Sequence, residues 1–137
     1  MPDILTTHSE EETTEAGRGL AAALSYGATV ALVGDLGAGK TAFVRGLAAG
    51  LGLPPNNVSS PTFTLVQEYR GPVTLHHVDL YRITGTEAEE LGLEELATGK
   101  AVVAIEWAEK LLRPIPGAIT VRFEDLGGDD RRITIER

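Results

Sequence analysis

The sequence predicts an α/β protein: a three-layer sandwich around a mixed sheet with parallel strands at its centre and antiparallel strands at its edges. Two unbroken apolar runs, 28–33 and 101–105, have the composition of strands buried on both faces of a parallel sheet. A glycine-rich octet, 34–41, links the first run to a segment with helical spacing. Apolar residues that alternate in period two at 119–123 and 132–135 predict an antiparallel hairpin.

The N-terminal half is expected to alternate helix, strand and helix. Ser9 and Glu12 have the spacing of a capping box, and apolar residues at helical intervals follow them, so the first helix is expected to run to about Leu24. The strand at 28–33 comes next. After the octet, apolar residues recur on one helical face up to Leu51, and the turn formers beyond it predict the end of the second helix.

The C-terminal half predicts further strands and one helix. Two strand-like stretches, 63–69 and 73–81, flank a Gly-Pro turn, which favours a tight antiparallel hairpin. An acidic segment with recurring leucines predicts a short helix over 86–96. The run 101–105 is the second expected central strand. The chain contains no internal repeat or long linker, so we expect one domain over 1–137.

Composition and charge exclude several classes of protein. The 137 residues are 42% hydrophobic and 23% charged, which suits a globular domain with one core, and none of them is cysteine. No apolar run approaches the ~20 residues of a membrane span, and the acidic N-terminus has no features of a secretory signal, so we expect a cytoplasmic protein. With 12 basic against 20 acidic residues, we expect no DNA binding and only indirect contact with RNA, through a partner protein.

The octet carries the strongest chemical signal, because it matches G-x-x-x-x-G-K-[ST] between a buried strand and a helix. Backbone N–H groups of such a loop cradle phosphates at the N-terminus of the helix, so the fold is expected to be P-loop NTPase-like. Lys40 is expected to bridge the β- and γ-phosphates of the nucleotide, and the Thr41 hydroxyl to ligate Mg²⁺. The residues expected to contact the nucleotide are Asp35, Leu36, Gly37, Ala38, Gly39, Lys40, Thr41 and Ala42.

Two acidic residues are candidates for the carboxylate that a P-loop enzyme needs at the end of a neighbouring strand. Glu106 follows the apolar run, and Asp79 follows a more mixed strand. If both are functional, one serves the metal and the other orients the attacking water. The adjacent His76 and His77 point to opposite faces of a strand, which excludes joint metal ligation and favours a structural role.

Other features bear on the nucleotide and its surroundings. Trp107, beside Glu106, is expected either in the core or against the nucleotide or a partner. The stretch Ser60, Pro61 and Thr62 either forms a switch near phosphate or is an ordinary loop. The chain lacks the guanine-reading N-K-x-D motif, which favours ATP over GTP.

Four motifs in this order resemble the TsaE (YjeE) family of small bacterial P-loop ATPases: Gly-Asp-Leu-Gly-Ala-Gly-Lys-Thr at 34–41, Ser-Pro-Thr-Phe-Thr-Leu-Val at 60–66, His-Val-Asp-Leu-Tyr-Arg at 77–82 and Ile-Glu-Trp at 105–107. The resemblance extends from the first expected helix to Trp107. It implies an ATPase required for forming N6-threonylcarbamoyladenosine at position 37 of tRNAs that read codons beginning with A. It also implies action with a TsaB–TsaD pair, in which TsaD carries the group transfer.

The resemblance also implies roles for individual residues. Lys40 would grip the phosphates, Thr41 and Glu106 would bind Mg²⁺, and Asp79 would be the catalytic or water-positioning acid. The 60–62 stretch would be the switch near the γ-phosphate, with Trp107 beside the metal-binding acid. Near the N-terminus, Thr7 or His8 would approach the adenine.

Two alternatives from other functional classes use the same loop. A small-molecule kinase would transfer the phosphoryl group to an acceptor, although the sequence has no inserted segment to build an acceptor pocket. A nucleotide-gated binding module would use ATP to control docking, with hydrolysis incidental.

Overall fold

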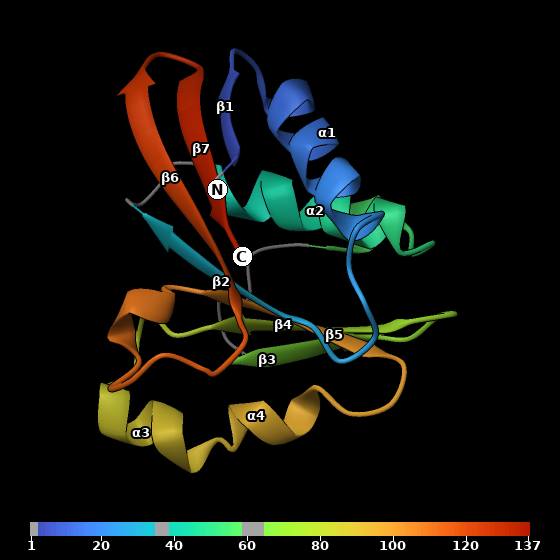
Figure 1. Ribbon diagram of the computed structural model, residues 1–137, viewed down its shortest axis with the longest axis vertical. Helices are drawn as coiled ribbons and strands as arrows, with labels where there is room; N and C mark the ends of the chain where they lie inside the picture. The colour runs from blue at the N-terminus through green and yellow to red at the C-terminus, as the bar shows by residue number, and fades with distance from the viewer. Residues whose placement is uncertain (1–2, 35–38, 59–64) are drawn as a thin grey trace.

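The computed structural model describes residues 3–34, 39–58 and 65–137, which form a seven-stranded sheet with helices on both faces (Figure 1). The strands are β1 (Asp3–Thr7), β2 (Thr29–Gly34), β3 (Val66–Tyr69), β4 (Thr74–Asp79), β5 (Ala101–Glu106), β6 (Ile119–Gly127) and β7 (Asp130–Glu136). The helices are α1 (Glu10–Ala21), α2 (Lys40–Gly50), α3 (Gly85–Glu90) and α4 (Leu93–Leu96), with 3-10 turns η1 (Pro55–Asn57) and η2 (Ala108–Lys110). No helix within these ranges is long and apolar enough to cross a membrane.

The sheet is parallel at its centre and antiparallel at both edges, in the strand order β1-β7-β6-β2-β5-β4-β3. Strand β2 pairs in parallel with β5 and with β6, and β5 pairs in parallel with β4. The hairpins β3–β4 and β6–β7 and the pair β1–β7 are antiparallel. The predicted fold class is therefore confirmed, because the two apolar runs occupy adjacent central positions as β2 and β5.

Two apolar cores lie on opposite faces of the sheet and make the three layers. Alternate residues of β5 serve the two cores: Val102 and Ala104 pack beneath α1 and α2, whereas Val103 and Ile105 pack against the side of α3 and α4. All four side chains are buried. This double burial explains why β5 is an unbroken apolar run in the sequence.

Helices α1 and α2 pack closely because glycines face the partner helix. A Cβ atom on Gly17 would lie 2.1 Å from the Phe43 carbonyl oxygen, and one on Gly46 would lie 1.8 Å from that of Thr14. Neither position has room for a side chain at this separation. The contact holds α2, which carries Lys40 and Thr41, against the sheet.

The first strand, β1, was not expected from the sequence. Its residues are exposed except Thr7, because β1 is an edge strand paired only with β7, so no buried alternation marks it. Helix α1 ends at Ala21 rather than near Leu24, since the Leu24 amide bonds the Ala21 carbonyl in a tight turn.

Three further boundaries differ from the expected ones. The single helix expected over 86–96 is two short helices, because Gly92 between them has a left-handed backbone (φ 63°). Strand β4 ends at Asp79 rather than 81, where the Asp79 carboxylate accepts a hydrogen bond from the Tyr81 amide. The C-terminal hairpin is longer than expected, since its pairing continues to Gly127 opposite Asp130.

Candidate nucleotide-binding site

The carboxyl ends of β2, β4 and β5 meet the N-terminus of α2, which is the usual place for a ligand in an open parallel sheet. Asp79 and Glu106 are the last residues of their strands and are register partners across the β4–β5 pair. Thr41 in the first turn of α2 contacts Glu106. The structure therefore brings Thr41, at the start of α2, together with Glu106 and Asp79, the two acids that the sequence proposed.

Helix α2 begins directly after Gly39, whose φ of 95° places it in the left-handed region that favours glycine. The Lys40 side chain is buried, and its Nζ donates to the Gly34 carbonyl at 2.7 Å. The same Nζ lies 3.6 Å from the centroid of the Trp107 ring, a cation–π contact. Lys40 is thus held over the end of β2 by a backbone oxygen and an indole face.

Thr41 and Glu106 present oxygen atoms to the same space. The Thr41 hydroxyl lies 3.3 and 3.5 Å from the two carboxylate oxygens of Glu106, whose residue is only 4% exposed. Hydroxyl and carboxylate oxygens suit Mg²⁺, which commonly takes one or two protein ligands and fills its octahedron with phosphate and water oxygens. The described residues contain no cluster of three His, Cys, Asp or Glu able to hold a metal alone. This donor set therefore fits a nucleotide-bound Mg²⁺.

His77 is a site residue that the sequence analysis placed only in a structural role. Its imidazole is fully buried, and Nε2 lies 2.5 Å from Oε2 of Glu106. His76 points to the opposite face, as expected, and its ring lies 3.8 Å from Glu68. The sequence did contain a signal for this position, because side chains two residues apart on a strand point to the same face. His77 therefore shares one face of β4 with Asp79.

The second acid, Asp79, is partly buried beside the first. Burial raises the pKa of the Asp79 carboxyl, and the negative charge of Glu106 raises it further. The hydrogen bond from the Tyr81 amide and the charges of His77 and Lys40 oppose that rise in pKa. The net effect is a raised pKa, so the Asp79 carboxyl group is easier to protonate than an exposed aspartate.

Trp107 follows Glu106 with a left-handed backbone, φ 61°, the only such non-glycine among the described residues. Its ring packs against the core on the side of α3 and α4, while also covering Lys40 and lying 4.9 Å from the ring of Tyr81. The core position expected as one alternative for Trp107 is therefore confirmed, and its contact with a nucleotide or partner stays a prediction. A strained non-glycine position at a strand end is common in functional sites.

Comparison with known proteins decides the family. A family model described as "Threonylcarbamoyl adenosine biosynthesis protein TsaE" matches residues 7–133. The chain belongs to the TsaE family. Among curated relatives, a tRNA threonylcarbamoyladenosine biosynthesis protein TsaE of Treponema pallidum is 38% identical over 94% of this chain and 96% of its own length. The protein of the same name from Bacillus subtilis is 41% identical over 93% of this chain and 81% of its own length.

A solved structure supports the same relationship. The crystal structure of YdiB from Bacillus subtilis has a TM-score of 0.76 and 34% sequence identity, and the match covers 98% of this chain and 84% of that one. Membership of the TsaE family links the chain to tRNA threonylcarbamoyladenosine biosynthesis.

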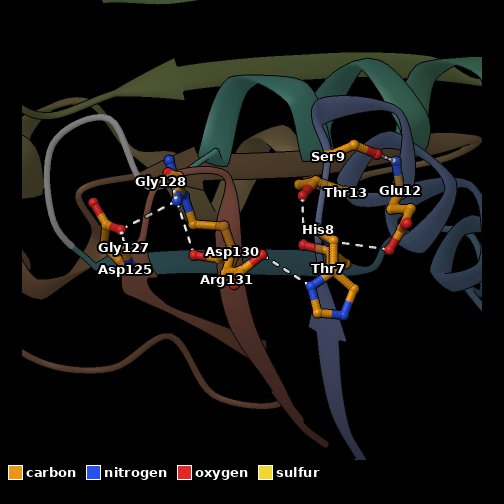
Figure 2. A network of polar contacts seen from close by, with 10 residues as sticks. All are labelled: Thr7, His8, Ser9, Glu12, Thr13, Asp125, Gly127, Gly128, Asp130 and Arg131. Carbon is orange, nitrogen blue, oxygen red and sulfur yellow. Dashed lines mark hydrogen bonds and ion pairs between the residues drawn. The ribbon is translucent and has the colours of Figure 1, made fainter.

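His8 of this TsaE chain contacts the β6–β7 turn (Figure 2). Its Nδ1 lies 2.9 Å from Oδ1 of Asp130, and this hydrogen bond raises the pKa of the His8 imidazole. Beside it, the Thr7 hydroxyl bonds that of Thr13 at 2.8 Å. An approach of Thr7 or His8 to adenine stays a prediction.

The remaining residues expected at the nucleotide or in the switch divide into two groups. Ala42 is buried in the first turn of α2. The others lie outside the described residues: Asp35, Leu36, Gly37, Ala38, Ser60, Pro61 and Thr62.

Proposed function

We propose that this protein is the Mg²⁺-dependent ATPase subunit that supports formation of N6-threonylcarbamoyladenosine at position 37 of tRNAs reading codons that begin with A, acting with the TsaB–TsaD pair in the cytoplasm. The observation that carries the proposal is the contact of Thr41 with Glu106 beside the buried Lys40. Those three side chains supply the metal ligands and the phosphate-binding cation of a P-loop ATPase. The family and its curated names supply the biosynthetic context.

In this proposal each described side chain has one task in the hydrolysis of ATP. Lys40 exchanges its Gly34 carbonyl for oxygens of the β- and γ-phosphates. Thr41 and Glu106 hold Mg²⁺, which would neutralise charge on the phosphate oxygens. Asp79 orients the attacking water and accepts its proton as the water oxygen bonds the γ-phosphorus. The bond from that phosphorus to the bridging oxygen breaks, and ADP and phosphate leave.

The distribution of charge supports a role for protein partners. Arg45, in the middle of α2, donates to the Val58 carbonyl and to Glu10, so its guanidinium is engaged by those two groups. An arginine that reaches the transferring phosphoryl group commonly raises the rate by ~10³-fold or more. The formal net charge of −8 makes direct tRNA binding unfavourable. We therefore assign tRNA contact to the partners and expect weak hydrolysis by the isolated chain.

The test is Mg²⁺-dependent release of phosphate from ATP, with and without TsaB–TsaD, by the wild type and the Lys40→Ala variant. We expect strong stimulation by the pair and a loss of at least ~10²-fold in Lys40→Ala. Lys100→Ala is a matched control, because Lys100 lies near the Tyr26 ring and precedes β5, at the opposite end of that strand from Glu106. Failure of the pair to bind or stimulate an ATP-competent chain would overturn the biological role.

Two further measurements distinguish the proposal from the two alternatives. Transfer of labelled γ-phosphate to a small acceptor, rather than release as inorganic phosphate, would replace the proposal with a kinase. Normal tRNA modification by a Glu106→Ala variant that still binds ATP and its partners would favour a nucleotide-gated binding module.

A further inference from the structure

The 3-10 turn η2, directly after β5, carries two charged side chains that bond the backbone of two other site segments. Glu109 Oε2 accepts a hydrogen bond from the Gly34 amide at 3.1 Å. The neighbouring Lys110 Nζ donates to the Tyr81 carbonyl at 2.7 Å. None of the four motifs that identified the family contains Glu109 or Lys110.

Gly34 is the residue at which β2 ends and the phosphate-binding octet begins. Its backbone is left-handed in φ, at 141°, and a Cβ atom there would lie 2.5 Å from the Phe123 carbonyl oxygen of β6. Its amide is held by Glu109, and its carbonyl is held by Lys40 at 2.7 Å. The Glu109 carboxylate and the Lys40 ammonium therefore bond the two backbone polar groups of Gly34.

Lys110, the last residue of η2, connects this turn to the segment that follows β4. The backbone carbonyl of Tyr81 accepts the hydrogen bond from Lys110, and the ring of Tyr81 lies 4.9 Å from the Trp107 ring. The Trp107 ring in turn covers the Lys40 ammonium at 3.6 Å. Turn η2 thus connects the end of β2, the segment after Asp79 and the indole above Lys40.

We propose that Glu109 is a positioning residue for the phosphate-binding loop, acting through Gly34 on the placement of Lys40. The inference rests on the proposed nucleotide-binding function. A hydrogen bond to a carboxylate is stronger than one to water or a neutral acceptor, and here it fixes an amide at the end of a strand. Without the Glu109 carboxylate, the Gly34 amide loses its acceptor and Gly34 is less firmly held. The Gly34 carbonyl, which orients Lys40, then moves with the rest of the residue. Placing Gly34 and Lys40 correctly then becomes part of the free energy that nucleotide binding must supply.

The variants Glu109→Ala and Glu109→Gln test this role, because a glutamine side-chain oxygen can still accept from the Gly34 amide. Measurements are the dissociation constant for ADP with Mg²⁺, by calorimetric titration, and the thermal unfolding midpoint. We expect Glu109→Ala to weaken ADP binding about tenfold with little change in midpoint, since the side chain is exposed. Glu109→Gln should bind within about twofold of wild type. Glu124→Ala is the control, because it removes the same charge from an exposed position paired with Arg132.

Exchange of the Gly34 amide proton, followed by NMR in the absence of nucleotide, is a second measurement. Protection should fall in Glu109→Ala and persist in Glu109→Gln. Wild-type ADP affinity in Glu109→Ala, or an equal loss in the glutamine variant, would overturn the positioning role alone. A wild-type chain that binds ADP but ignores TsaB–TsaD would overturn the partnership alone. A wild-type chain that binds no nucleotide would overturn both.

Discussion

The Nε2 atom of His77 lies 2.5 Å from Oε2 of Glu106, and both side chains are buried at the carboxyl ends of neighbouring strands. The same carboxylate oxygen lies 3.3 Å from the Thr41 hydroxyl. His77 therefore fixes the carboxylate from one side while Thr41 approaches it from the other. A partner of this kind sets the direction in which a metal-binding carboxylate presents its oxygens.

Replacing His77 is expected to weaken Mg²⁺ binding and to destabilise the fold. Loss of an outer partner commonly costs ~10–100-fold in metal affinity, so His77→Ala should raise the Mg²⁺ concentration for half-maximal ATP hydrolysis by about tenfold or more. It should also lower the free energy of unfolding by about 3 kcal/mol, because the buried Glu106 loses its partner. Magnesium titration and urea unfolding measure the two effects.

His77→Gln separates the metal effect from the stability effect, because its amide keeps a donor near Glu106 and should recover part of the Mg²⁺ affinity. His76→Ala, on the opposite face of β4, should leave Mg²⁺ dependence unchanged. An unaltered Mg²⁺ titration in a folded, active His77→Ala variant would contradict the positioning of Glu106 by His77.

The fluorescence of Trp107 should report nucleotide binding. It is the only tryptophan in the chain, and its ring centroid lies 3.6 Å from the Lys40 ammonium. When the phosphates draw that ammonium away, the electrostatic environment of the indole changes, so emission should shift in intensity or wavelength on addition of ADP. The Lys40→Ala variant should show altered emission already in the absence of nucleotide. Constant emission while ADP binding is confirmed calorimetrically would exclude this movement of Lys40.

The sequence predicted those site parts that carry their own local signal. Glu106 was found because an acid ends a fully buried strand, and Lys40 because a glycine-rich loop precedes it. The contact of Glu109 with Gly34 spans 75 residues and depends on how η2 folds back over β2, which no local pattern encodes. For His77 the strand period places its side chain on the same face as Asp79, but its contact with Glu106 also depends on the register of β4 against β5.

The same difference between local and long-range signals explains which strands could be predicted. The central strands β2 and β5 were predictable because burial on both faces produces continuous apolar runs. Strand β1 was not, because backbone pairing with β7 holds it in place and most of its side chains face solvent. An edge strand of this kind is specified by its neighbour rather than by its own composition.

The close contact of α1 with α2 predicts opposite outcomes for two glycine substitutions. Gly46→Ala places a Cβ 1.8 Å from the Thr14 carbonyl oxygen, so the helices must separate, and the free energy of unfolding should fall by about 1–3 kcal/mol. Gly19→Ala, also within a helix, meets no described atom within 4 Å and should stabilise by up to ~1 kcal/mol through helix propensity. Urea unfolding of both variants measures the difference. Equal stability of the two would contradict the packing assigned to Gly46.

The ion pair between His8 and Asp130 should make stability depend on pH. The hydrogen bond to Asp130 raises the pKa of His8 above its ordinary value of 6.5, so the folded state holds the imidazole proton more tightly than the unfolded state does. The contribution is therefore fully present below about pH 6.5 and is lost as the pH rises through the raised pKa. The His8 resonances, followed by NMR, should titrate at a higher pH than those of a short peptide containing histidine. Asp130→Asn should lower the midpoint of that titration and remove this part of the pH dependence of urea unfolding. An unchanged His8 titration in Asp130→Asn would show that another group raises its pKa, because Asp130 supplies both the hydrogen bond and the largest charge effect.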